Sequence, residues 1–107
     1  MPYGLTDSTL SAIRGVLQEH HEVKRAILYG SRAKGTQQNG SDIDMTLDGE
    51  DISFRNLLKI ETQLDGLDLP YHFDVSVLQR LTSPELLEHI RRVGCDLKNS
   101  GTSNIQR

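Results

Sequence analysis

The segment from Asp42 to Asp48 constrains the fold more than any other part of the chain. Its apolar residues Ile43, Met45 and Leu47 alternate strictly with polar residues at positions 42, 44, 46 and 48. Successive side chains of a β-strand point to opposite faces of the sheet, so the pattern predicts a strand with one packed face and one acidic face. Because the packed face must be covered, the chain is expected to pair this strand with others and to lay helices over its apolar side.

Further helices and strands are predicted on either side of this segment. Apolar residues at helical spacing predict helices over residues 7–20 and from Ser53 to Leu67, and Ser83-Pro84 predicts the start of a third that ends at Gly94. Short apolar or alternating runs predict strands over residues 23–29 and 71–78 and a short edge strand over 96–98. The order predicts an α+β fold, a small mixed β-sheet backed by helices on one face. Residues 1–98 are expected to form a single domain, with the polar residues 99–107 as a flexible tail.

Composition excludes several classes of protein. The 107 residues include no apolar run near the ~18–20 residues of a membrane span, and the first residues lack the layout of a signal peptide, so a cytoplasmic protein without membrane contact is expected. The single cysteine, Cys95, excludes an internal disulfide framework and a cysteine-based zinc site. The net charge of −3 argues against binding to bulk nucleic acid, although a divalent cation can still place a nucleotide beside carboxylates.

The segment Gly30-Ser31-Arg32-Ala33-Lys34-Gly35 follows a predicted strand and opens a helical turn. Glycine lets the backbone approach a ligand closely, and the free amides at a helix start favour an anion. The Ser31 hydroxyl is a further donor, and Arg32 and Lys34 add positive charge. A plain strand-to-helix turn is the structural alternative. A Walker A loop is excluded, because Thr36 occupies the position of its phosphate-binding lysine.

Three aspartates are candidate metal ligands. Asp42 and Asp44 are two residues apart on one predicted strand, so their carboxylates point to the same side, close enough to share a hard cation. Without that cation, the two like charges would raise the pKa of one carboxyl. Asp74 lies between two apolar residues on a strand that can lie beside this one, and would complete a cluster of three. The alternative for each is an aspartate that faces solvent.

The histidines and the cysteine have structural interpretations. His20-His21 would end the first helix, where positive charge is favoured. His72 is interpreted as a strand-edge residue, and His89 as part of a solvated or partner-facing side of the third helix. Cys95 fits a small buried position. The spacing of the histidines does not support metal ligation.

Taken together, Gly30-Ser31, ten intervening residues, Asp42-x-Asp44 and the later Asp74 resemble the DNA polymerase β-like nucleotidyltransferase superfamily. The resemblance covers residues 8–98 and is strongest to its minimal form, the stand-alone prokaryotic subunit (MNT). This subunit is often paired with a HEPN-type helical-bundle protein, and some such pairs are toxin–antitoxin modules. The resemblance implies a polymerase β palm-like fold and transfer of a nucleoside monophosphate, usually from ATP, to a hydroxyl acceptor.

The resemblance also implies roles for the candidate residues. Gly30 and Ser31 would hold the triphosphate, and Asp42, Asp44 and Asp74 would hold two Mg²⁺ ions. In a two-metal site, Asp42 and Asp44 would bridge both ions and Asp74 would contact only the acceptor-side ion. Arg32 and Lys34 would offset charge on the departing pyrophosphate.

Three hypotheses about the biological role remain. The first is a catalytic subunit that works with a helical-bundle partner or a second copy, because a chain this short leaves no second wall to orient an acceptor. The second is a non-catalytic antitoxin that neutralises a helical partner by contact. The third, an aminoglycoside nucleotidyltransferase, would need an acceptor-binding domain that the sequence does not contain. The acceptor itself stays open between protein tyrosine, an RNA end and a small molecule.

Overall fold

Four strands form one mixed sheet in the order β3-β2-β1-β4. The computed structural model describes residues 1–98, and its strands are β1 (Arg25–Tyr29), β2 (Ile43–Asp48), β3 (Phe73–Val77) and β4 (Cys95–Asp96). Strand β1 pairs antiparallel with both β2 and β4, whereas β2 and β3 are parallel. The mixed sheet confirms the predicted α+β class, and the predicted tail, 99–107, lies outside the described residues.

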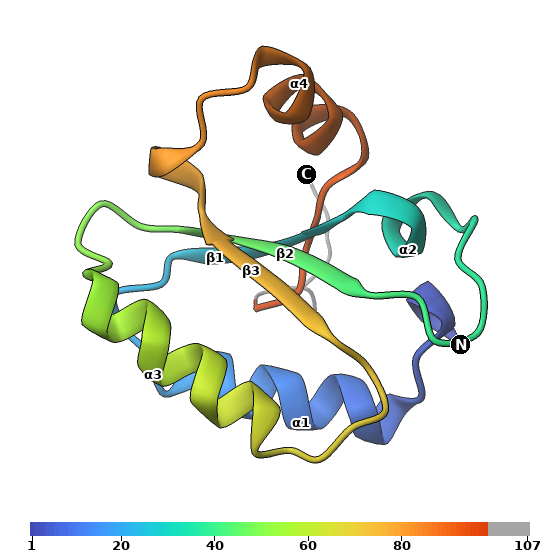
Figure 1. The fold of residues 1–107 in the computed structure, drawn as a ribbon. Coiled ribbons are helices and arrows are strands. Elements are labelled where there is room, and N and C mark those ends of the chain that lie inside the picture. The colour runs from blue at the N-terminus through green and yellow to red at the C-terminus, as the bar shows by residue number, and fades with distance from the viewer. Residues whose placement is uncertain (99–107) are drawn as a thin grey trace.

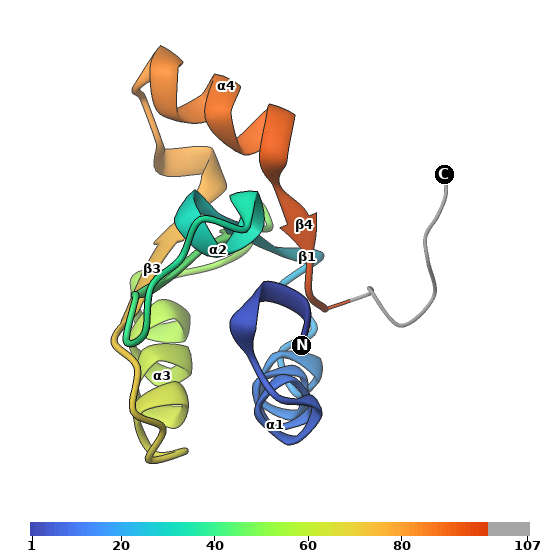
Figure 2. The same ribbon diagram turned by 90° about the vertical axis from the view of Figure 1, so that its right-hand side faces the viewer.

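Helices cover both faces of the sheet. Figures 1 and 2 show α1 (Asp7–Gln18) and α3 (Phe54–Asp65) side by side under one face, as predicted. The short α2 (Gly30–Lys34) follows β1, and α4 (Pro84–Val93) lies over the opposite face (Figure 2). The prediction that helices back only one face is therefore wrong for the third predicted helix, since α4 packs on the other side. Two 3-10 turns, Pro2–Gly4 and Leu78–Arg80, complete the elements. The second turn follows β3 directly and leads into α4 on that opposite side.

The alternating pattern of β2 sets the orientation of the sheet. Its residues Ile43, Met45 and Leu47 are fully buried, in one core with Ile13 of α1 and Ile60 of α3. The residues between them therefore face the other side of the sheet, where Thr46 accepts a hydrogen bond from the Ser76 hydroxyl at 2.9 Å. This orientation turns the acidic positions of β2 away from the core and toward α4.

The predicted helix starts are confirmed by their capping bonds. The hydroxyl of Thr6 accepts from the Thr9 amide at 3.1 Å, and Ser53 and Ser83 cap α3 and α4 in the same way. These side chains satisfy backbone donors that have no partner inside the helix.

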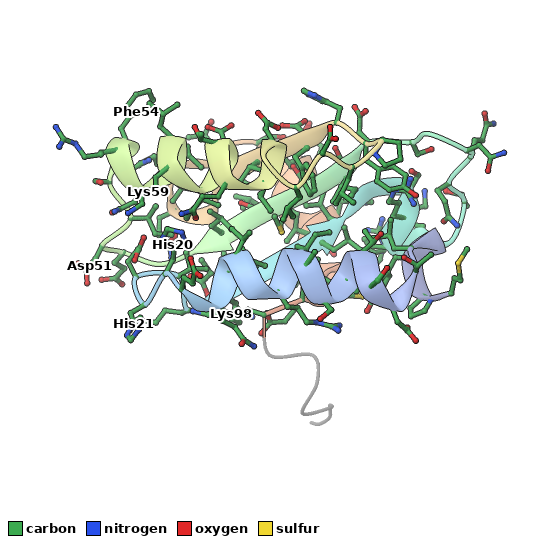
Figure 3. All side chains as sticks on the ribbon, turned by 90° about the horizontal axis from the view of Figure 1, so that it is seen from below. His20, His21, Asp51, Phe54, Lys59 and Lys98 are labelled. Atoms are coloured by element: carbon green, nitrogen blue, oxygen red, sulfur yellow. The ribbon has the colours of Figure 1, made fainter. Side chains whose placement is uncertain are left out.

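The first helix ends earlier than predicted, and His20 has a different role. Helix α1 stops at Gln18, and the His20 side chain is buried, with its Nε2 2.6 Å from Oε1 of Gln63 on α3. The Lys98 ammonium donates to the His20 carbonyl at 3.0 Å. In Figure 3, seen from below, His20 lies between the two helices and His21 points outward. His20 therefore joins α1 to α3 instead of placing charge at a helix end.

Within residues 1–98, no helix is long and apolar enough to cross a membrane. The cytoplasmic location stays a prediction.

Candidate functional site

Asp44 and Asp74 meet on adjacent strands at one end of the sheet. In the parallel pairing of β2 with β3, Asp44 lies directly opposite Asp74, and on its other side Asp44 lies opposite Tyr29 of β1. Neighbouring strands are about 4.8 Å apart, so paired side chains on one face are close neighbours. Asp42 immediately precedes β2. The sheet thus brings the three aspartates to one end of the face that is turned away from the core.

Asp44 is the central carboxylate of the three. It is half-buried, whereas Asp42 and Asp74 are exposed. Burial raises the pKa of Asp44 above its ordinary value, and the negative charges of Asp74 and Asp42 raise it further. The nearby His89 and His72 act in the opposite direction on this pKa. A carboxyl whose ionisation is opposed by two neighbouring carboxylates is typical of a site that receives a cation.

The donor set fits Mg²⁺ in its chemistry, because carboxylate oxygens are the hard ligands that this ion prefers. In the part of the chain that the structure describes, no group of three or more His, Cys, Asp or Glu side chains is close enough together to hold a metal ion as it stands. Asp42 and Asp74 are exposed, so their carboxylates lie at the surface beside the half-buried Asp44.

Gly30 adjoins the carboxylates directly. Its φ of +76° lies in the left-handed region, and a Cβ at this position would overlap the Oδ2 atom of Asp44. Its amide donates to the Nε2 atom of His89 on α4 at 3.0 Å. A side chain is therefore excluded here by the carboxylate, and the Gly30 amide is bonded within the protein. The predicted part of Gly30 in holding a triphosphate stays a prediction. Ser31, the next residue, is half-buried at the start of α2.

Arg32 requires a correction, because it is not placed to meet a nucleotide. Its side chain is buried, with 2% exposure, and its guanidinium donates to the carbonyls of Ser41 (2.8 and 3.1 Å) and Tyr3 (2.9 Å). The same guanidinium lies 4.6 Å from the ring centroid of Tyr71. A fork of donors suits this position, since it satisfies two carbonyls at once. Arg32 therefore has a structural role: it holds the residue that precedes Asp42.

Lys34 ends α2 and is exposed, one residue before Gly35 stops the helix in the left-handed conformation. Its ammonium group is free to reach solvent or an anion near the turn. Its predicted contact with pyrophosphate stays a prediction.

Two residues of the site were missed by sequence reasoning. Tyr29 stands beside Asp44 on the same face, and its pKa is raised by burial and by the charges of Asp74 and Asp44, while a hydrogen bond with Ser76 opposes the shift. The ring of His89 packs edge-on against Tyr29, with centroids 6.1 Å apart and planes at 82°. Strand alternation could have identified Tyr29. No local signal marks His89, because its contacts depend on where α4 packs.

Comparison with known proteins gives a consistent family and fold. A family model described as Polymerase beta, Nucleotidyltransferase matches residues 11–100. No curated protein sequence matches the chain significantly.

Several solved structures share the fold. A toxin–antitoxin complex with AMP-PNP has 23% identity and a TM-score of 0.61, over 82% of this chain and 71% of that one. The tri-AMPylated Shewanella oneidensis HEPN toxin in complex with MNT antitoxin has 18% identity and a TM-score of 0.59, over 87% and 71%. A putative nucleotidyltransferase from Sulfolobus solfataricus has 15% identity and a TM-score of 0.52, over 97% and 98%.

Proposed function

This chain belongs to the polymerase β nucleotidyltransferase family, and we propose that it transfers AMP from ATP to a hydroxyl group of a helical partner protein. The observation that carries the proposal is the strand register, which sets Asp44 beside Asp74 and against Gly30 at the start of the Gly30-Ser31 turn. Acidic side chains beside a Gly-Ser turn at one end of a sheet suit a reaction between a metal-bound triphosphate and a hydroxyl.

The proposed binding roles follow from these positions. Asp42 and Asp44 would hold two Mg²⁺ ions, and Asp74 would hold only the ion on the acceptor side. When bound, the ions supply positive charge that offsets the charge of the phosphates. Ser31 would hold the triphosphate through its hydroxyl, while Gly30 provides the space that the Asp44 carboxylate occupies.

The proposed reaction is an in-line displacement. The acceptor oxygen attacks the α-phosphorus of ATP, the bond to the bridging oxygen breaks, and pyrophosphate leaves with that electron pair. Asp74, which is exposed beside Asp44, would take the proton of the acceptor hydroxyl. Lys34 would offset charge on the departing pyrophosphate.

The partner is proposed from the fold and from the neighbours. The solved complexes pair proteins of this fold with a toxin, and one of those toxins is AMPylated. By analogy, this chain is proposed to act as the catalytic antitoxin of a two-component system. A non-catalytic antitoxin would form the same complex, so only transfer separates the two roles.

Nucleotide binding is tested by thermal unfolding. At ten times its dissociation constant, a ligand stabilises a folded domain by about 1.4 kcal/mol. For a domain of this size, that is a rise of roughly 5–10 °C in melting temperature. ATP with Mg²⁺ is expected to produce this rise, and ATP with EDTA little or none. Equal rises under the two conditions would contradict a metal-bridged site.

Transfer is tested with α-labelled ATP, Mg²⁺ and a candidate helical-bundle partner, sought among the products of the neighbouring genes. A stable hetero-complex is expected on size-exclusion chromatography, with label on the partner and weak transfer by the isolated chain. A complex that forms without any labelling favours the non-catalytic antitoxin. A monomer that efficiently modifies a defined acceptor without the partner would refute the proposed two-component role.

A further inference from the structure

Helix α4 is only loosely packed on the sheet. It buries Ile90, while Leu86, Leu87 and Val93 are partly exposed. A cavity of about 320 Å³ lies beneath the helix, with Ile27 of β1 and Leu87 and Ile90 of α4 in its lining. Because α4 buries one apolar side chain, a polar contact between this helix and the sheet carries more weight in fixing its position.

A hydrogen bond holds α4 at the end nearest the carboxylates. The Nε2 atom of His89 accepts from the Gly30 amide at 3.0 Å, and the edge of the same ring contacts Tyr29. An imidazole nitrogen that accepts must be unprotonated, which places the proton of the neutral ring on Nδ1. His89 therefore connects α4 to the last residue of β1 and the first residue of α2.

Gly30 links this bond to the candidate site. Its amide is bonded to His89, and the side of its Cα that lacks a side chain faces the Asp44 carboxylate. A shift of Gly30 would therefore change both the space available to Asp44 and the position of Ser31, which follows it in the chain.

We propose that His89 is a positioning residue: it fixes α4 to Gly30 and so holds the Gly30-Ser31 turn in the geometry that accepts the nucleotide. That a nucleotide binds at this turn rests on the proposed function, whereas the contact between His89 and Gly30 rests on the structure alone. Helix α4, whose sequence shows an ordinary amphipathic helix, thereby contributes one side chain beside the site.

Three substitutions at one position test the proposal. His89→Leu keeps the bulk but removes the acceptor, His89→Asn has a polar group that is too short to reach, and His89→Gln presents an acceptor near the position of Nε2. One neutral hydrogen bond corresponds to roughly a threefold to tenfold change in affinity. The dissociation constant for Mg·ATP, measured by calorimetry, is expected to rise by this factor in the Leu and Asn variants. The Gln variant should stay within about twofold of wild type.

Gly30 amide exchange, measured by NMR, gives a readout that does not depend on nucleotide. It is expected to accelerate about tenfold in the Leu and Asn variants and to return toward wild type in the Gln variant. His21→Leu is the matched control, since His21 is an exposed histidine that points outward below the sheet (Figure 3). It should change neither the exchange rate nor the affinity.

Each outcome decides the proposal. Unchanged or tighter Mg·ATP binding in His89→Leu would overturn it, and so would a Gln variant that binds as weakly as the Leu variant. If wild type binds no Mg·ATP, the proposed function fails. The positioning of Gly30 by His89 is then still judged from amide exchange. Equal Gly30 exchange rates in wild type and the three His89 variants would overturn this positioning role as well.

Discussion

Asp44→Asn is expected to reduce nucleotidyl transfer by at least about a thousandfold while the chain still folds. The substitution removes one negative charge and almost no volume, from the carboxylate that lies between Asp74 and the Gly30 turn. Because Asp44 would help to hold the ions, its loss should also weaken Mg·ATP binding. The measurements are initial rates of label transfer to the partner and the melting shift with Mg·ATP.

The folded state of the Asp44→Asn variant should be at least as stable as wild type near neutral pH without metal. Burial and the charges of Asp74 and Asp42 raise the pKa of Asp44, so its ionised form is less favourable in the folded chain than in the unfolded chain. The resulting loss of folding stability is complete above the pKa of Asp44 in the folded chain. It disappears as the pH falls below the ordinary aspartate pKa near 4. The advantage of the variant should therefore shrink on acidification, as measured by thermal unfolding from pH 7 to pH 4.

Asp74→Asn separates the two proposed carboxylate roles. Transfer should again be lost, but Mg·ATP binding should persist, because Asp74 would serve only the acceptor side. Asp51→Asn is the matched control, since Asp51 is an exposed aspartate in the loop between β2 and α3. If Asp74→Asn abolished nucleotide binding as fully as Asp44→Asn, the assigned roles would be wrong.

Arg32→Leu is expected to be the most destabilising of these substitutions, by about 2–4 kcal/mol. The guanidinium satisfies the carbonyls of Ser41 and Tyr3 in a buried position and stacks on Tyr71, so its removal leaves two carbonyl groups without these donors. At roughly 4–8 °C per kcal/mol, the melting temperature should fall by about 10 °C or more. Denaturant and thermal unfolding measure the change.

Two further variants accompany Arg32→Leu: Arg32→Lys is the conservative substitution, and Lys34→Leu is the exposed control. One ammonium cannot reproduce the fork of donors, so Arg32→Lys should recover less than half of the loss. Lys34 is exposed two residues away, and Lys34→Leu should change stability by no more than about 0.5 kcal/mol. An Arg32→Leu variant as stable as Lys34→Leu would show that Arg32 is not structural.

Much of the fold follows from local patterns. Alternation in β2 predicted which residues are buried and which face the opposite side, because the side-chain period of a strand leaves only two faces. Helical spacing and capping residues predicted α1, α3 and α4, because a cap satisfies backbone groups that lie only a few residues away in the chain. The Gly-Ser turn and the three aspartates were identified in the same way, although their roles stay predictions.

The partners of individual side chains could not be predicted, because they come from distant parts of the chain. Arg32 looked like a phosphate ligand by position, yet the 2–4 segment and Ser41 close over it and satisfy its donors. His89 looked solvated on its helix, but the docking of α4 brings it to Gly30. Local spacing specifies the face on which a side chain lies. Which atoms meet it there depends on how helices and strands pack together, and a buried cation or imidazole then takes the partners that packing brings within reach.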